Sequence, residues 1–168
     1  MRILFLGDVV GISGCSKLLN NLRNEIESKK IDFVIVNAEN AASQGVGLTK
    51  EICNDFFNCG VNVITTGNHV WDQKEITEYI DKEERLLRPK NFFEPAPGNG
   101  FGIYNTKENI KIGVLNLMGN VFIKKCEDVF EVSEKFIKQH KLKEDYDLLV
   151  IDFHGEITSE KNAIGHFF

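Results

Sequence analysis

The 168-residue sequence lacks several features that would assign it to a protein class at once. No apolar run approaches the ~18 residues that a membrane-spanning helix needs, and the apolar start, Met1–Leu6, is too short for a signal peptide. The four cysteines form no Cys-x-x-Cys pair, which argues against a zinc knuckle. No Gly-x-Gly-x-x-Gly motif follows the first apolar run, so a nucleotide-binding module of the doubly wound type is a weaker alternative. We therefore expect a cytoplasmic protein with reduced thiols.

Basic residues are also too few for a broad nucleic-acid-binding surface. The chain has 20 Lys and Arg against 25 Asp and Glu, a net charge of -5. Non-specific binding of nucleic acid depends on dense positive charge. This composition excludes broad nucleic-acid binding, but it is compatible with a small anionic ligand held at one local site.

Five short apolar runs, rich in β-branched and aromatic residues, predict strands that are buried on both faces. Helical patterns lie between these runs, and the alternation of strand and helix predicts an α/β fold with a mostly parallel sheet between helices. No linker or repeat divides the chain, so we expect a single domain over residues 1–168. The predicted strands are Ile3–Leu6, Phe33–Val36, Val61–Ile64, Ile112–Leu117 and Leu148–Phe153.

The start and stop signals of the helices are local. Thr49 can cap a helix that Gly60 ends, and Asp72 with Glu75 resembles a capping box. The segment 85–102 holds all three prolines and predicts a long surface loop, followed by a hairpin around 105–109. The other predicted helices contain Leu18, Leu19, Leu22 and Ile26; Val129, Val132, Phe136 and Ile137; and Ala163, Ile164 and Phe167, the last starting near Thr158.

Polar residues follow every apolar run. In open parallel sheets, ligands bind beyond the carboxyl ends of the strands, so these residues are expected at one edge. Carboxylate and amide oxygens suit hard divalent cations and imidazole suits iron, manganese or zinc, so the combination indicates a di-metal hydrolase. The residues in question are Asp8; Glu39 and Asn40; Asn68 and His69; Asn116 and Asn120; and Asp152, His154 and Glu156.

Each residue also has a simpler interpretation. Asp8 could cap a helix, Asn40 and Asn68 could serve turns, and His154 could be a buried structural histidine. Glu39 is harder to explain structurally, because an unpaired carboxylate directly after a buried strand is costly. The joint pattern, rather than any single residue, favours a shared site.

Five segments together resemble the YmdB-type branch of the calcineurin-like metallophosphoesterases, over essentially the whole chain. The Asn-Ala-Glu-Asn and Asp-Phe-His segments, in this order, are the most specific. The segments are Gly7-Asp8-Val9-Val10-Gly11-Ile12-Ser13-Gly14, Asn37-Ala38-Glu39-Asn40-Ala41-Ala42, Thr66-Gly67-Asn68-His69-Val70-Trp71-Asp72, Arg85-Leu86-Leu87-Arg88-Pro89 and Asp152-Phe153-His154-Gly155-Glu156-Ile157-Thr158-Ser159-Glu160-Lys161.

The resemblance implies a fold, an activity and a set of roles. The fold would be a sandwich of two sheets between helices, and the activity that of a phosphodiesterase for 2',3'-cyclic nucleotides or related phosphodiesters. Two divalent metal ions are implied, iron or manganese first, with magnesium or zinc as alternatives. Asp8 and Asn40 would bind one ion, Glu39 would bridge both, and Asn68 with His154 would bind the second. His69 would be the catalytic acid, and Gly45, Gly47 and Asn116 would contribute to substrate binding.

Members of the family continue beyond position 168 with a Gly-Thr-His-Thr-His motif that completes both metal shells. We therefore expect a C-terminally truncated chain whose second sheet is incomplete. The alternative function is a catalytically impaired remnant that binds phosphate, metal or a partner without turnover. Its apolar end, Phe167-Phe168, could also pair with a second copy, which makes a homo-oligomer an expectation.

Overall fold

The computed structural model describes residues 1–123 and 126–168, and it contains two β-sheets. The first sheet is entirely parallel, with strand order β1-β2-β3-β4, and the second has the order β5-β6-β7. In the second sheet β5 is antiparallel to β6, whereas β7 is parallel to β6. The strands are β1 (Ile3–Leu6), β2 (Phe33–Asn37), β3 (Val63–Thr65), β4 (Leu86–Leu87), β5 (Phe101–Asn105), β6 (Lys111–Met118) and β7 (Leu148–His154).

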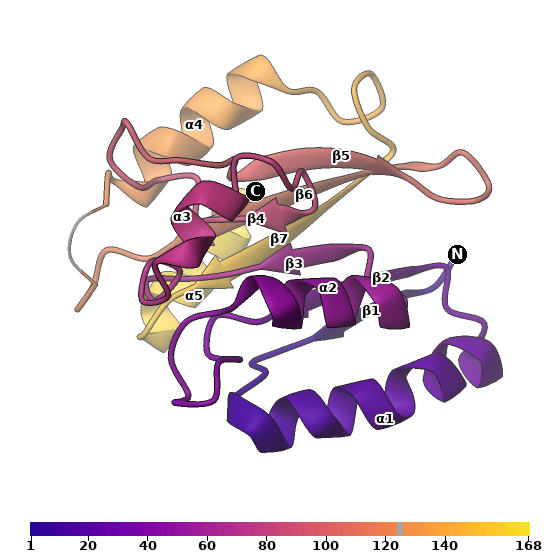
Figure 1. The fold of residues 1–168 in the computed structure, drawn as a ribbon. Coiled ribbons are helices and arrows are strands. Elements are labelled where there is room, and N and C mark those ends of the chain that lie inside the picture. The colour runs from indigo at the N-terminus through magenta and orange to yellow at the C-terminus, as the bar shows by residue number, and fades with distance from the viewer. Residues whose placement is uncertain (124–125) are drawn as a thin grey trace.

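Helices cover the outer faces of both sheets (Figure 1). The first two helices pack on the parallel sheet, and the fourth covers the second sheet, so the predicted α/β sandwich is confirmed. The helices are α1 (Gly11–Lys29), α2 (Lys50–Cys59), α3 (Glu75–Tyr79), α4 (Val129–Gln139) and α5 (Thr158–Phe167).

The strand sequences are continuously apolar because both of their faces are buried. Along β2, Val34 and Val36 pack with α1 and α2, whereas Phe33 and Ile35 point toward the second sheet. There they meet Val114 and its neighbours on β6 in an apolar layer between the sheets. All five predicted strands are present, with β3 beginning two residues later than the sequence indicated.

Several local signals act as predicted. The Thr49 hydroxyl accepts a hydrogen bond from the Ile52 N–H at 3.2 Å, and Gly60 ends α2 with a φ of 114°. The predicted hairpin joins β5 to β6 through residues 106–110.

Two predictions are wrong in detail. The capping box is absent: α3 begins at Glu75, whose carboxylate accepts the Lys50 N–H, while Asp72 binds His69. The segment 85–102 is also not a plain loop, because it contains β4 and the start of β5. A two-residue strand buried by its neighbours leaves no periodicity in the sequence.

The connection between β4 and β5 is organised by one buried cation. Arg88 is 4% exposed, and its guanidinium donates to the carbonyl oxygens of Pro89, Lys90, Ala96 and Pro97. It also pairs with Glu94 at 3.0 Å. Every polar edge of this side chain is therefore matched by an acceptor.

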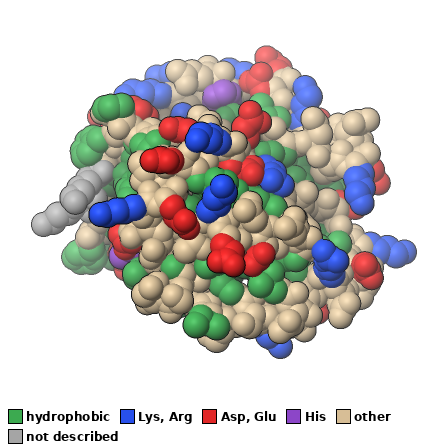
Figure 2. All heavy atoms as spheres, viewed as in Figure 1, with side chains coloured by type: hydrophobic (Ala, Val, Ile, Leu, Met, Phe, Trp, Pro, Cys, Tyr) green, Lys and Arg blue, Asp and Glu red, His purple; other side chains and the backbone are tan. Residues whose placement is uncertain are grey.

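Surface features agree with the composition. On the face shown in Figure 2, acidic and basic side chains are interspersed, without a continuous basic area. Across residues 1–123 and 126–168, no helix combines the length and apolarity that membrane crossing requires. The four cysteines are free thiols, as expected.

Candidate functional site

Four strand ends converge on one edge of the sandwich. Asp8 follows β1, Glu39 and Asn40 follow β2, Asn68 and His69 follow β3, and His154 is the last residue of β7. The first three strands are parallel neighbours, and β7 lies over them in the second sheet, where the Asp152 side chain contacts Asn37. The structure thus brings together the six residues that the sequence assigned to metal binding and catalysis.

Glu39 lies at the centre of this group and is fully buried. Its Oε1 accepts the backbone N–H of His69 at 2.9 Å. Its Oε2 is 2.8 Å from Nδ1 of His154, close enough for an ion pair. Within the described part of the chain, no group donates an aligned hydrogen bond to Oε2. One oxygen of this carboxylate is therefore held by the protein, and the other keeps a free lone pair.

His154 joins the two sheets at the site. Its Nε2 lies 3.0 Å from Oδ1 of Asn68, opposite the contact with Glu39. Burial lowers the pKa of His154, but the Glu39 carboxylate outweighs burial, so the net pKa is raised from its usual value. The imidazole is consequently held between a carboxylate oxygen and an amide oxygen.

Asp8 and Asn40 form a second pair at the rim. Nδ2 of Asn40 donates to Oδ2 of Asp8 at 2.6 Å. Burial raises the pKa of Asp8, although the bond from Asn40 lowers it, and the negative charge of Glu39 raises it further. The carboxylate of Asp8 therefore lies close enough to Glu39 for their charges to repel each other.

His69 is oriented by Asp72, which the sequence had placed at a helix start. Nδ1 of His69 lies 2.7 Å from Oδ2 of Asp72, and both side chains are exposed. A carboxylate at Nδ1 selects the tautomer with a proton on that nitrogen. The Nε2 edge is then free for a ligand.

Gly67 permits the close packing of this group. A Cβ atom at this position would clash with Oε2 of Glu39 and with the His154 ring. From the sequence, Gly67 is identified only as part of the Thr66-Gly67-Asn68-His69 motif. Its position directly before Asn68-His69 could have indicated this constraint, because a glycine beside a site often marks a close approach of the backbone.

The predicted substrate-binding residues lie in three different settings. Gly45 and Gly47 have φ values of 80° and 77° in the loop after Asn40. A side chain at Gly47 would meet Asp72 and Gln73, while Gly45 faces only Val10 within 4 Å. Asn116 is fully buried between the sheets and donates to the carbonyl oxygens of Thr66 and Leu87. Its amide nitrogen is therefore occupied by backbone groups, whereas Oδ1 is buried without a hydrogen-bond partner among the described residues.

The remaining histidines stay outside the site. His140 stacks at 4.7 Å from the Phe101 ring and 4.8 Å from the Phe136 ring, and His166 is exposed on α5. His140 therefore contributes to packing against the second sheet, and His166 faces solvent.

Residues 1–123 and 126–168 contain no group of three or more His, Cys, Asp and Glu side chains arranged to hold a metal ion. The donor chemistry nevertheless fits a divalent cation when amide oxygens are included. Among the described residues the buried Oε2 of Glu39 has no hydrogen-bond donor; it adjoins the imidazole of His154, which in turn contacts the amide oxygen of Asn68. Carboxylate, amide and imidazole donors together are typical of iron, manganese or zinc sites.

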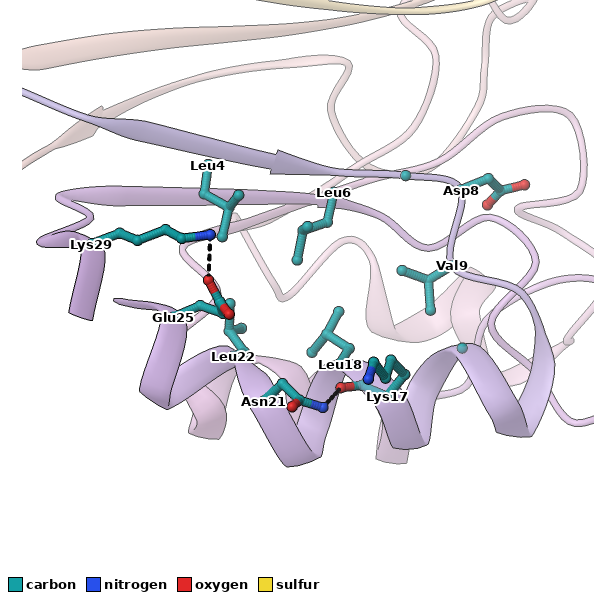
Figure 3. A pocket seen from close by; sticks show the side chains of 12 residues that line it. Leu4, Leu6, Asp8, Val9, Lys17, Leu18, Asn21, Leu22, Glu25 and Lys29 are labelled. Atoms are coloured by element: carbon teal, nitrogen blue, oxygen red, sulfur yellow. Dashed lines mark hydrogen bonds and ion pairs between the residues drawn. The ribbon is translucent and has the colours of Figure 1, made fainter. Parts of the chain in front are cut away.

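An apolar hollow of ≈ 500 Å³ lies next to this edge, between β1 and α1. Leu4, Leu6 and Leu18 point into it, while the Asp8 carboxylate points away (Figure 3). The hollow offers few polar groups near the strand ends, so the candidate site is the polar cluster and not this hollow.

An α/β sandwich with donors at its strand ends is compatible with the calcineurin-like architecture. Comparison with known proteins agrees: the model of the YmdB-like protein family matches residues 4–168. The chain therefore belongs to the YmdB-like family.

Similar proteins are found among both curated sequences and solved structures. The chain is 40% identical over 167 residues to a 2',3'-cyclic-nucleotide 2'-phosphodiesterase of Bacillus subtilis, covering 99% of this chain and 62% of that protein. A putative phosphatase/phosphodiesterase of Mycoplasma pneumoniae is 37% identical, with 97% of this chain and 58% of that protein covered.

Two crystal structures share the fold. A hypothetical protein from Thermus thermophilus superposes with a TM-score of 0.90 at 31% identity, covering 99% of this chain and 63% of that one. A phosphatase from Mycoplasma pneumoniae superposes with a TM-score of 0.88 at 35% identity, covering 100% of this chain and 60% of that one. The chain thus spans about three fifths of the length of the relatives that it matches.

Proposed function

We propose that this chain carries the metal-binding strand ends of a phosphodiesterase for 2',3'-cyclic nucleotides or related small phosphodiesters. The observation that carries the proposal is the buried Glu39 carboxylate, held through one oxygen and presenting the other beside His154. The 2',3'-cyclic-nucleotide 2'-phosphodiesterase of Bacillus subtilis, similar over 99% of this chain, supports the substrate class.

Two divalent ions would be held by the residues of the cluster. Asp8 and Asn40 would bind one ion, Asn68 and His154 the other, and Glu39 would bridge the pair. When bound, such a pair supplies Lewis-acid polarisation of a phosphoryl oxygen and a hydroxide nucleophile near neutral pH. The donor set suits iron or manganese, with magnesium or zinc as alternatives.

His69 would act as the proton donor. The contact with Asp72 fixes the ring through Nδ1, so Nε2 is the nitrogen that would deliver a proton to the leaving alkoxide. Gly45, in a loop with a positive φ and an open side, would let the substrate approach Asn40.

We further propose a cytoplasmic location, and an assembly with a second copy through the apolar end of α5.

The first test is metal content and manganese binding of the purified chain, with Glu39→Ala as the matched variant. We expect close to two equivalents of iron or manganese in the wild-type chain and loss of binding in Glu39→Ala. Absence of bound metal from both proteins, even with added manganese, would contradict the metal site.

The second test is turnover of a 2',3'-cyclic nucleotide with added manganese. We expect hydrolysis by the wild-type chain, and none by His69→Ala, which should still bind manganese. Metal binding without turnover would instead support the alternative function, a chain that binds metal and phosphate without catalysis. That alternative is favoured by one observation: residues 1–123 and 126–168 contain no group of three or more His, Cys, Asp and Glu side chains arranged to hold a metal ion.

A further inference from the structure

The candidate site is divided unequally between the two sheets. Loops of the parallel sheet carry five of its residues, and the second sheet carries His154 alone. The apolar layer between the sheets holds them together, but apolar contacts are non-directional and specify a relative position less sharply than hydrogen bonds do. Something more specific must set where His154 meets Glu39 and Asn68.

A polar contact crosses between the sheets directly beneath the site. Nδ2 of Asn37, the last residue of β2, donates to Oδ2 of Asp152 on β7 at 2.8 Å. Oδ1 of Asn37 accepts the Glu39 N–H at 3.2 Å. Asn37 therefore connects the backbone of Glu39 to the strand that carries His154, two residues before that histidine.

A second polar crossing lies beside the first. Asn116 is the register partner of Asp152 on the neighbouring strand β6. Its Nδ2 donates to the carbonyl oxygens of Thr66, at 2.8 Å, and Leu87, at 3.2 Å. Thr66 immediately precedes Gly67 and Asn68, so this crossing ties the second sheet to the other group that contacts His154.

These polar groups stand where apolar side chains would pack well. Asn37, Asn116 and Asp152 are all buried, and the positions before Asn116 on the same face, Ile112 and Val114, are apolar. Burying a carboxylate and two amides costs free energy that an apolar layer would avoid. The best-attested role of buried polar groups is to specify a single register between packed elements.

We propose that Asn37, Asn116 and Asp152 form a positioning layer that sets the register between the two sheets and so places His154 against Glu39 and Asn68. The inference deepens the proposed function, since it concerns the same metal site. The contacts that it explains nevertheless involve protein groups alone. It also accounts for Asn116, whose side chain supports the site from below.

The test exchanges the two partners of the contact between Asn37 and Asp152. Asn37→Asp places two carboxylates face to face and should break the contact by repulsion. The double variant Asn37→Asp/Asp152→Asn restores one amide and one carboxylate with the roles reversed. Asn37→Ser is a second way to break the contact, since its side chain is too short to reach Asp152.

The matched control is Val114→Ala, in the same inter-sheet layer. It removes as many side-chain heavy atoms as Asn37→Ser, and so reports the effect of a packing defect alone. Two readouts are compared at equal fractions of folded protein. The first is the proton resonance of the His154 Nδ1–H in the metal-free chain, assigned with His154→Gln. The second is the affinity for manganese.

We expect Asn37→Asp and Asn37→Ser to shift or abolish the His154 resonance and to weaken manganese binding by about 10- to 100-fold. The double variant should recover both, and Val114→Ala should keep both despite its lower stability. The proposal would be overturned if the double variant did not recover the His154 resonance and the manganese affinity. It would also be overturned if Val114→Ala lost both as Asn37→Ser does, because the Asn37–Asp152 contact would then be an ordinary packing contact. If the wild-type chain binds no manganese, the metal site fails, while the resonance still decides the inference. Should Asn37→Asp not fold, Asn37→Ser against Val114→Ala gives the same decision.

Discussion

Two buried charges, Glu39 and Arg88, lie just past the ends of two strands of the parallel sheet, β2 and β4, and serve opposite purposes. Arg88 follows β4 and is surrounded by four carbonyl oxygens and one carboxylate, which occupy its donors. Glu39 lies beyond the end of β2 and is buried even more completely, yet its Oε2 receives no aligned hydrogen bond within the described residues. Both charges are costly to bury, but only Arg88 has its polar edges matched throughout by hydrogen-bond acceptors.

The difference separates a structural charge from a candidate functional one. A cation whose donors are all matched orders the proline-rich segment around it and has no capacity left for a ligand. A carboxylate with a free lone pair, beside an imidazole and an amide oxygen, is arranged to accept one. Burial alone would have treated the two residues alike.

The largest expected effect concerns stability at Arg88. Arg88→Ala leaves several carbonyl oxygens without a donor, and should lower the free energy of unfolding by about 3 kcal/mol, measured by urea denaturation. Manganese affinity, measured on the folded fraction, should stay unchanged because the hydrogen-bond partners of the Arg88 side chain in the described residues all lie between Pro89 and Pro97, outside the site. Arg88→Lys should also destabilise the chain, since an ammonium cannot match the planar fork. If folded Arg88→Ala bound manganese more weakly than the wild-type chain, Arg88 and Glu39 could not be separated into a structural charge and a functional one.

A smaller loss of stability is expected at Gly67, which packs against Glu39. Gly67→Ala inserts a methyl group against Oε2 of Glu39 and the His154 ring, and should cost about 1–3 kcal/mol through overpacking. It should also weaken manganese binding, because the Glu39–His154 contact must open. Isothermal titration with manganese and thermal unfolding give the two measurements.

Gly165→Ala is the control for that substitution. Gly165 lies within α5, and a Cβ there would meet nothing within 4 Å. This variant should gain about 0.5–1 kcal/mol of stability with unchanged manganese affinity. Equal behaviour of the two alanine variants would show that Gly67 is not constrained by the site.

The smallest effect is a pH dependence of stability in the metal-free chain. The pKa of His154 is raised in the folded state, so the folded chain binds this proton more tightly than the unfolded chain. The stabilisation is therefore fully present below about pH 6.5, the unfolded value, and is lost as the pH rises through the folded pKa.

Urea denaturation at a series of pH values, with a chelator present, measures this dependence. His154→Gln should remove it, because the titrating imidazole is gone. A wild-type stability that stays level above pH 6.5, or an unchanged slope in His154→Gln, would show that the Glu39–His154 ion pair does not form without metal.

Much of the fold could be predicted because its signals are local. Strands buried on both faces are continuously apolar, as Val34 and Ile35 illustrate, and the Thr49 cap and the Gly60 stop lie within a few residues of the helix that they bound. Strand β4 could not be predicted, since two residues carry no period. The capping interpretation of Asp72 failed because the side chain had a competing partner, His69, three residues away.

The residues of the candidate site were determined by the sequence, since each follows an apolar run and parallel strands end at one edge. The partners of these residues were decided by the tertiary structure alone. That His154 faces Glu39 across two sheets, that Gly67 must lack a side chain, and that Asn116 supports the site from within the core all depend on contacts between distant segments. Such contacts follow from how the sheets pack, and packing depends on the shapes of many side chains together, which no short stretch of sequence records.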